Sequence, residues 1–252
     1  MKITFLGTGT SCGIPVIGCD CEVCRSSDPK DKRTRTSIII EHQGMHILID
    51  TSIDLRFQAL RSHIKRIDMV LFTHAHVDHI HGLDELRQFN FLQGHEIPCY
   101  GSRETIQDLY TRYAYIFKKT QIGGGKPRVS FQVINAPLRI NNLHIQPVEI
   151  LHGELPILGY RINDMAYLTD CSHIPEHSKR HLQGLKLLIL GALKRTPHPT
   201  HYNLEQAVEA VNELGAQQAL FIHIAHELAH HYVNKELPPH IQLAYDGQIV
   251  EL

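Results

Sequence analysis

One heptapeptide constrains this chain more than any other feature: Thr73-His74-Ala75-His76-Val77-Asp78-His79. It follows residues 70–72, whose apolar composition is typical of a buried strand. Side chains two positions apart in a strand point the same way, so His74 and His76 can converge on one ion. The turn that follows can carry Asp78 and His79 to a neighbouring ion. Because imidazole and carboxylate suit Zn²⁺, Mn²⁺ or Fe, the segment predicts two adjacent metal sites.

Composition supports metal binding and limits the possible partners. Histidine accounts for 20 of the 252 residues, and the formal net charge is -1. A nearly neutral chain has no global positive field that could hold long nucleic acid. The first residues lack the apolar stretch of a secretory signal, and no apolar run is long enough to span a bilayer. We therefore expect a cytoplasmic protein with neither a membrane partner nor a long nucleic acid partner.

Apolar runs of strand length recur along the chain between segments with helical spacing. This mixture predicts an α/β protein in which helices cover two sheets. Composition does not shift sharply anywhere, so we expect one domain over residues 1–252. The expected strands lie at residues 3–6, 37–40, 46–49, 69–72, 129–134, 143–150, 159–162, 166–168, 187–190, 219–222 and 241–244, and the expected helices at 83–92, 105–117, 175–181 and 204–214.

The heptapeptide resembles the metallo-β-lactamase superfamily, whose His-x-His-x-Asp-His hallmark it matches at every position. The resemblance implies a four-layer αββα sandwich of two mixed sheets flanked by helices. It also implies a hydrolytic centre with two divalent metals, Zn or Mn, whose further ligands follow strands downstream. By this resemblance one metal is held by His74, His76 and His152 and the other by Asp78, His79 and His223, with Asp170 bridging the two.

Asp50 ends the apolar run 45–49 and matches the upstream aspartate of the same superfamily. Carboxylates in that position fix the orientation of metal-binding imidazoles. The alternative is that Asp50 only starts a turn. We expect the orienting role, and we count Asp50 and Asp78 among the catalytic residues.

Three cysteines are packed into Cys19-Asp20-Cys21-Glu22-Val23-Cys24. In a cytoplasmic chain such spacing favours a metal over disulfides, although three reduced cysteines without a metal would have the same pattern. The segment is similar to the opening of the superfamily branch that includes the cyclic phosphodiesterase PhnP, where a histidine three positions after the last active-site ligand completes a structural zinc site. That histidine is His226 here. A closed Cys₃His set leaves no position for water, so the resemblance implies a zinc that staples the N-terminal loop, residues 7–26.

The remaining cysteines, Cys12, Cys99 and Cys171, fit no ligand spacing and are expected to be packing residues. A competing motif is His226-Glu227-Leu228-Ala229-His230, which matches the His-Glu-x-x-His of zinc peptidases. That chemistry needs both histidines on one helix with the glutamate as general base. The motif competes for His226 and has no marked third ligand, so we expect Glu227, His230 and His231 to lie on a polar cleft rim or a helix face.

Two adjacent metals can share a hydroxide and stabilise charge on a phosphodiester, while the leaving alkoxide needs a proton donor. The PhnP-like branch has a catalytic histidine just ahead of a late helix. His201 is the best match because Asn203 can cap a helix that begins at Leu204, and His198 is the alternative. We therefore expect a phosphodiesterase that acts on small or cyclic phosphodiesters, of the ribose cyclic phosphate or cyclic nucleotide type, through a metal-bridging hydroxide.

Several alternatives remain open. An RNA-processing endoribonuclease of the tRNase Z type would use an extended arm, and none is obvious here. Thioester hydrolases of the glyoxalase type, ranked with lactone hydrolases, generally append a helical domain. A non-catalytic carrier of the PqqB type keeps the cysteines but has a degraded catalytic set, whereas this set is complete. The cationic, glycine-containing segment 118–128 is either a solvated loop or a phosphate contact, and relatives suggest a homodimer.

Overall fold

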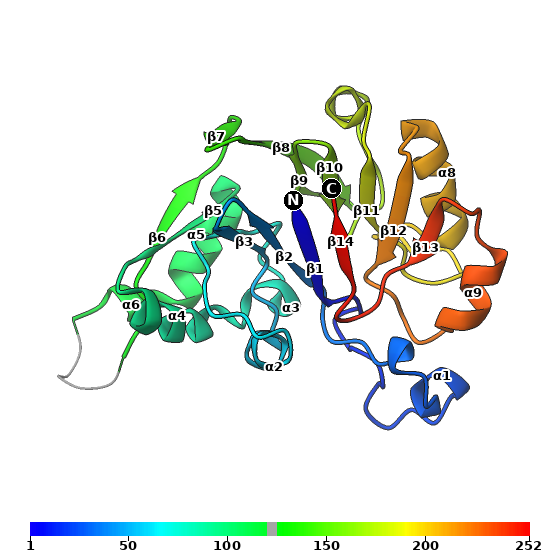
Figure 1. Ribbon diagram of the computed structural model, residues 1–252, viewed down its shortest axis with the longest axis horizontal. Coiled ribbons are helices and arrows are strands. Elements are labelled where there is room, and N and C mark those ends of the chain that lie inside the picture. The colour runs from blue at the N-terminus through cyan, green and yellow to red at the C-terminus, as the bar shows by residue number, and fades with distance from the viewer. Residues whose placement is uncertain (120–124) are drawn as a thin grey trace.

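Two seven-stranded sheets form the centre of the computed structural model, which describes residues 1–119 and 125–252 (Figure 1). In spatial order the first sheet contains β14 (Ile249–Glu251), β1 (Lys2–Gly7), β2 (Ser37–His42), β3 (Met45–Ile49), β4 (Met69–Leu71), β5 (Ile97–Gly101) and β6 (Val129–Val133). The second contains β13 (Ile241–Leu243), β12 (Gln218–Ile222), β11 (Leu187–Gly191), β10 (Met165–Leu168), β9 (Leu155–Ile162), β8 (Leu143–His152) and β7 (Leu138–Ile140).

Both sheets are mixed. In the first sheet β3 to β6 run parallel, while β14, β1, β2 and β3 pair antiparallel. In the second sheet β10 to β13 run parallel, while β7 to β10 pair antiparallel. Parallel strands deliver their carboxyl ends to one edge of a sheet, and that edge is where functional groups of such folds gather.

Helices cover the outer face of each sheet. Those on the first sheet are α2 (Leu55–Arg61), α3 (Val77–Ile80), η2 (Leu83–Glu85), α4 (Leu86–Gln93), α5 (Arg103–Arg112) and α6 (Ala114–Phe117). Those on the second are α7 (Glu176–Lys179), η3 (Arg180–Leu182), α8 (Leu204–Leu214) and α9 (His230–Glu236), while α1 (Glu22–Arg25) and η1 (Pro29–Asp31) lie in the N-terminal loop.

Three apolar clusters hold these layers together. One lies between the sheets and includes Phe5, Ile47 and Tyr160, and the other two fill the spaces between each sheet and its helices. Strands in such a stack are buried on both faces, which explains why they read as continuous apolar runs. The expected four-layer αββα sandwich is confirmed, and the chain ends lie side by side on β1 and β14 (Figure 1).

The expected elements are mostly present, with local differences. Strands β5, β7 and β14 were not expected. In β5 Pro98 interrupts the apolar pattern, yet the strand pairs between β4 and β6. The expected helix at 105–117 is two helices that meet at Tyr113. Part of the segment 118–128 lies outside the described residues. Within the described ranges, no helix combines the length and the apolar character needed to cross a membrane.

Candidate active site

The candidate metal ligands gather where strands of the two sheets end next to each other. Asp50 follows β3, Asp170 follows β10 after one residue, and His223 directly follows β12. The heptapeptide 73–79 leaves β4 and enters the short helix α3. The structure therefore brings together side chains from four strand ends that are up to 173 positions apart, counted from Asp50 to His223.

The first group of expected ligands is centred on His74. Its Nε2 lies 3.0 Å from Nδ1 of His76, and the ring of His152 is 5.7 Å from that of His74, centroid to centroid. Nδ1 of His152 lies 2.9 Å from the carbonyl oxygens of Asp170 and Thr200. Because carbonyls only accept hydrogen bonds, this Nδ1 carries a proton, and Nε2 is the nitrogen that can bind a metal.

The second group consists of Asp78, His79 and His223, whose ligand atoms lie within 4.8 Å of one another. Nε2 of His79 is 3.3 Å from Asp78 Oδ2 and 3.2 Å from Asp170 Oδ1, while His223 Nε2 is 3.1 Å from Asp170 Oδ2. The carboxylate of Asp170 also groups with His74 and His79 at the same spacing. Asp170 is therefore placed where the bridging ligand was expected.

Asp50 is fully buried and orients its neighbours. Its Oδ2 accepts a hydrogen bond from Nδ1 of His79 at 2.8 Å and one from the hydroxyl of Thr73 at 2.8 Å. Thr73 in turn lies 3.0 Å from Nδ1 of His74, so one carboxylate fixes imidazoles of both groups. This is the role expected for Asp50 from the sequence. Thr73 was not expected to take part, because the sequence shows it only as the first residue of the heptapeptide.

The charges around His79 favour the binding of a cation. Burial lowers the pKa of its imidazole, but Asp170, Asp78 and Asp50 outweigh burial and hold this pKa well above its usual value. Nε2 of His79 and both ring nitrogens of His223 are buried and make no hydrogen bond of good geometry among the described residues, although both Nε2 atoms lie 3.2 and 3.1 Å from Asp170 oxygens. Three carboxylates and unpartnered imidazole nitrogens in a buried site are what divalent cations require.

Three of these residues have left-handed backbones. The φ angles are +62° at Asp50, +54° at Asp170 and +55° at His223. Aspartate and histidine both adopt this region more often than most residues do, but any residue other than glycine is strained there, so the turn at His223 costs free energy. The tight turn after β12 directs the His223 imidazole toward Asp78 and Asp170 at the expense of stability.

We expect glycine to be better than alanine at position 223, the reverse of the usual order. Glycine adopts a positive φ freely, whereas alanine does not, so metal-free His223→Gly should be about 1 kcal/mol more stable than metal-free His223→Ala. Urea unfolding of the two variants gives this difference directly. Equal stabilities, or a more stable alanine variant, would show that the turn is not strained.

His201 lies beside both groups of ligands. Its ring centroid is 4.6 Å from that of His152 and 4.9 Å from that of His223, whereas His198 lies one ring further out, 5.2 Å from His201. Asn203 caps α8 with a capping box, as the sequence predicted. Burial lowers the pKa of His201 to about 3, so a proton donor role requires the negative charge of a bound substrate beside it.

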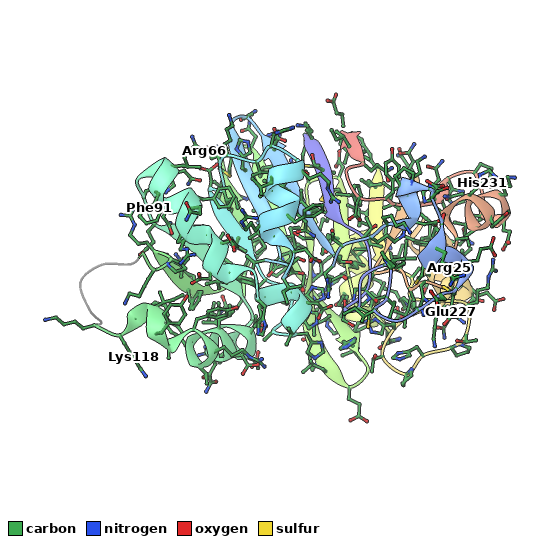
Figure 2. The ribbon with its side chains drawn as sticks, turned by 90° about the horizontal axis from the view of Figure 1, so that it is seen from below. Arg25, Arg66, Phe91, Lys118, Glu227 and His231 are labelled. Carbon is green, nitrogen blue, oxygen red and sulfur yellow. The ribbon has the colours of Figure 1, made fainter. Side chains whose placement is uncertain are left out.

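The cysteine cluster is assembled as expected. His226 Nδ1 lies 3.3 Å from the Sγ atoms of Cys19 and Cys21 and 3.6 Å from that of Cys24. Hydrogen bonds lower the pKa of the Cys21 thiol to about 6. The largest effect comes from the backbone N–H of Cys24 and the next from the side chain of His226. A thiolate at neutral pH suits zinc, and the four ligand atoms lie within 4.8 Å of one another. Figure 2 shows Arg25 of this loop and Glu227 of the segment after His226 at the same end of the molecule.

Two further expectations are decided by the structure. The His-Glu-x-x-His match is not a peptidase site, because residues 226–229 are not helical and α9 begins only at His230. His226 belongs to the cysteine cluster instead. Cys99 and Cys171 are buried packing residues as expected, but Cys12 is exposed, so that expectation was wrong.

His230 lies instead against a buried arginine, Arg33, which no sequence pattern marks. Nη2 of Arg33 is 3.2 Å from Nδ1 of His230, and an arginine can only donate, so His230 is neutral. Burial, and then Arg33 and Lys30, lower the pKa of His230 to about 4, against opposing effects of Asp28 and Asp31. The importance of Arg33 follows from its burial and from its contacts with residues that are distant in the sequence. The sequence alone shows neither the burial nor the contacts.

His230 should make stability depend on pH. Its pKa of about 4 in the folded protein is below the value of 6.5 of an unperturbed histidine, so its contribution is present above pH 6.5 and is lost as the pH falls toward 4. The variant His230→Gln keeps an acceptor for Arg33 but cannot titrate. Its melting temperature should therefore fall less steeply between those pH values than that of the wild type, and parallel curves would contradict this origin.

The comparisons with known proteins agree with this geometry. Residues 45–224 match the family model described as the beta-lactamase superfamily domain. A solved structure of a new diphosphatase from the PhnP family is 42% identical, with a TM-score of 0.93, over 100% of this chain and 97% of that one. Coenzyme PQQ synthesis protein B of Rhodopseudomonas palustris is 33% identical over 89% of each chain.

An octanoyltransferase of Porphyromonas gingivalis is 40% identical over 98% of this chain but only 51% of its own length. The chain thus spans about half the length of that relative. The family model and the PhnP-family structure also cover the strands that carry the candidate metal ligands. The chain belongs to the metallo-β-lactamase superfamily and, within it, to the PhnP-like branch.

Proposed function

We propose that this chain is a binuclear metal-dependent phosphodiesterase that acts on small phosphodiesters, including cyclic ones. The observation that carries the proposal is the position of Asp170, whose two carboxylate oxygens face His79 and His223 at 3.2 and 3.1 Å. It also joins His74 in a group of potential ligands. One carboxylate shared between two sets of imidazoles is the arrangement of a two-metal hydrolytic centre.

The residues present fit two divalent cations. One would be held by His74, His76 and His152 and the other by Asp78, His79 and His223, with Asp170 between them. The assignment is supported by the buried nitrogens of His79 and His223, which make no hydrogen bond of good geometry, and by the carboxylates that surround His79. When bound, the two ions would supply Lewis acidity toward the phosphoryl oxygens and toward an attacking water. Zinc in the cysteine cluster would be structural.

The protein itself would contribute orientation and a proton. Asp50 keeps His79 and, through Thr73, His74 in fixed orientations, so little reorganisation is needed during the reaction. His201 lies at the edge of the centre, where it would hold a proton for the leaving oxygen. This donor is useful for an alkoxide leaving group, which supports a phosphodiester over a thioester.

A diphosphate linkage is the second candidate substrate. The PhnP-family relative at 42% identity is described as a diphosphatase, and its likeness extends over the whole chain. Both linkages place a phosphorus between two bridging oxygens, so the same residues would serve either reaction. The small phosphodiester remains first because His201 is positioned to protonate a poor leaving group.

A substrate panel tests the proposal. Protein reconstituted with Mn²⁺ or Zn²⁺ is assayed on an aryl phosphodiester, a 2′,3′-cyclic nucleotide, a nucleotide sugar with a diphosphate bridge, a precursor transfer RNA, a thioester and a lactone. We expect the first two to be cleaved fastest, by the wild type and not by Asp170→Ala. Preference for RNA, thioester or lactone would overturn the substrate class. No turnover of any substrate would favour a carrier resembling the PQQ protein.

A further inference from the structure

Arg33 is a buried cation at the junction of three separate segments. Only 2% of its surface is exposed, and burial lowers its pKa to about 10, so it remains charged at neutral pH. A buried charge is costly unless it is well bonded, and breaking such an arrangement is strongly destabilising. Neither the proposed metal centre nor the cysteine cluster uses this side chain directly.

The first segment is the end of β1. Nη1 of Arg33 donates to Oγ1 of Thr8 at 2.7 Å and to the carbonyl of Ala244. The hydroxyl of Thr8 donates in turn to Asp246 at 2.8 Å, which brings a carboxylate close to the cation. The packing is tight here, because a Cβ on Gly9 would lie 2.9 Å from Cβ of Arg33.

The second segment is the cysteine loop. The backbone of Arg33 exchanges two hydrogen bonds of 2.8 Å with Ile14. Ile14 is buried and packs in a small apolar cluster with Val23 and Cys24, and Cys21 lies at the edge of that cluster. The position of the loop that carries the three thiols is therefore fixed against Arg33.

The third segment is residues 223–230. It contains His223, a proposed ligand in the active site, and His226, a proposed ligand in the cysteine cluster. Ile224 directly follows His223, and it is held by the carbonyl of Thr8 at 3.0 Å and the N–H of Thr10 at 3.2 Å. At the other end, His230 receives Nη2 of Arg33 at 3.2 Å. Arg33 thus acts on this segment directly at His230 and through Thr8 at Ile224.

We propose that Arg33 is a positioning residue that holds His223 and His226 in register, so that binding of a metal by the cysteine cluster strengthens metal binding in the active site. The physical reason is that His226 and His223 are three positions apart on a segment clamped at both ends. Because the clamps keep the segment rigid, a metal that fixes His226 also restricts the motion of His223. The inference rests on the proposed metal sites but not on the substrate.

The test compares Arg33→Met and Arg33→Lys with the control Arg61→Met. Arg61 also contacts Asp246, at 3.2 Å, but the structure gives it no bond to Thr8 or His230 among the described residues. Cobalt(II) is the probe: thiolate-to-cobalt absorption reports the cysteine cluster, and competition with a chelator reports the active site. Arg33→Met should weaken active-site binding by about 10- to 100-fold. Arg33→Lys keeps the charge but loses the forked guanidinium that reaches both Thr8 and His230, so its active-site metal affinity should lie between those of Arg33→Met and the wild type. The affinity of Arg61→Met should match that of the wild type.

A double-mutant cycle separates positioning from a general loss of stability. Cys21→Ser weakens the cysteine site, and if Arg33 acts through the same segment, Arg33→Met should add little to its effect on active-site affinity. Additive effects, or wild-type affinity in folded Arg33→Met, would overturn the proposal. If Arg33→Met does not fold, Thr8→Val replaces it with the same expected outcomes. Wild-type protein that bound cobalt normally but cleaved no phosphodiester would overturn the proposed substrate and leave this inference standing.

Discussion

Replacing Asp170 with alanine is expected to remove both active-site metals and, with them, the hydrolytic activity. Burial raises the pKa of this carboxyl, but His223 and His79 outweigh burial and hold it well below its usual range, so Asp170 is a carboxylate. Its oxygens face both of these imidazoles, and the same side chain groups with His74. A single substitution therefore takes a ligand from each proposed ion.

The expected loss of active-site metal affinity is at least about 100-fold, since even partners that only orient a ligand commonly contribute 10- to 100-fold. Elemental analysis after desalting gives the metal content, and the metal of the cysteine cluster is an internal standard that should stay. Asp164→Ala is the matched control, because Asp164 pairs with Lys186 on a partly exposed surface. An Asp170→Ala variant that kept its full metal complement would disprove the bridging assignment.

His201→Ala should give the opposite combination, with the metals retained and turnover lost. The ring lies 4.6 Å from His152 and 4.9 Å from His223, close enough to the proposed centre to protonate a leaving oxygen. General acids of this kind contribute about 10²- to 10⁴-fold, so kcat should fall by that factor. Substrates with a good aryl leaving group should be affected least, because they need no donor.

His198→Ala is the control for that experiment. His198 lies next to His201, and the neighbouring Thr200 N–H is 3.4 Å from its Nδ1, but its ring is further from the metal ligands. It should therefore affect kcat much less. If His198→Ala lost turnover and His201→Ala did not, the two roles would be exchanged. If His201→Ala lost a metal, His201 would be a ligand, which its grouping with Asp170 and His223 also allows.

Much of the fold could be read from the sequence because strands buried on both faces are written as continuous apolar runs. The same reading failed at β5, where Pro98 breaks the pattern but the neighbours β4 and β6 still pair with the strand. It also failed to separate α5 from α6 at Tyr113, because helical spacing alone does not mark a break inside an amphipathic run. Pairing and packing decided these details.

The candidate site, like the fold, was predicted from the sequence only in part. By itself, the sequence determined which residue types stand at the strand ends, because ligand chemistry and short spacing are local: the heptapeptide, the three cysteines and the cap of α8 are all legible in it. Only the tertiary structure decided that Thr73 links Asp50 to His74, that His230 faces a buried arginine and not a metal, and that Cys12 is exposed. These facts depend on burial and on partners that are distant in the sequence, and no local pattern encodes them.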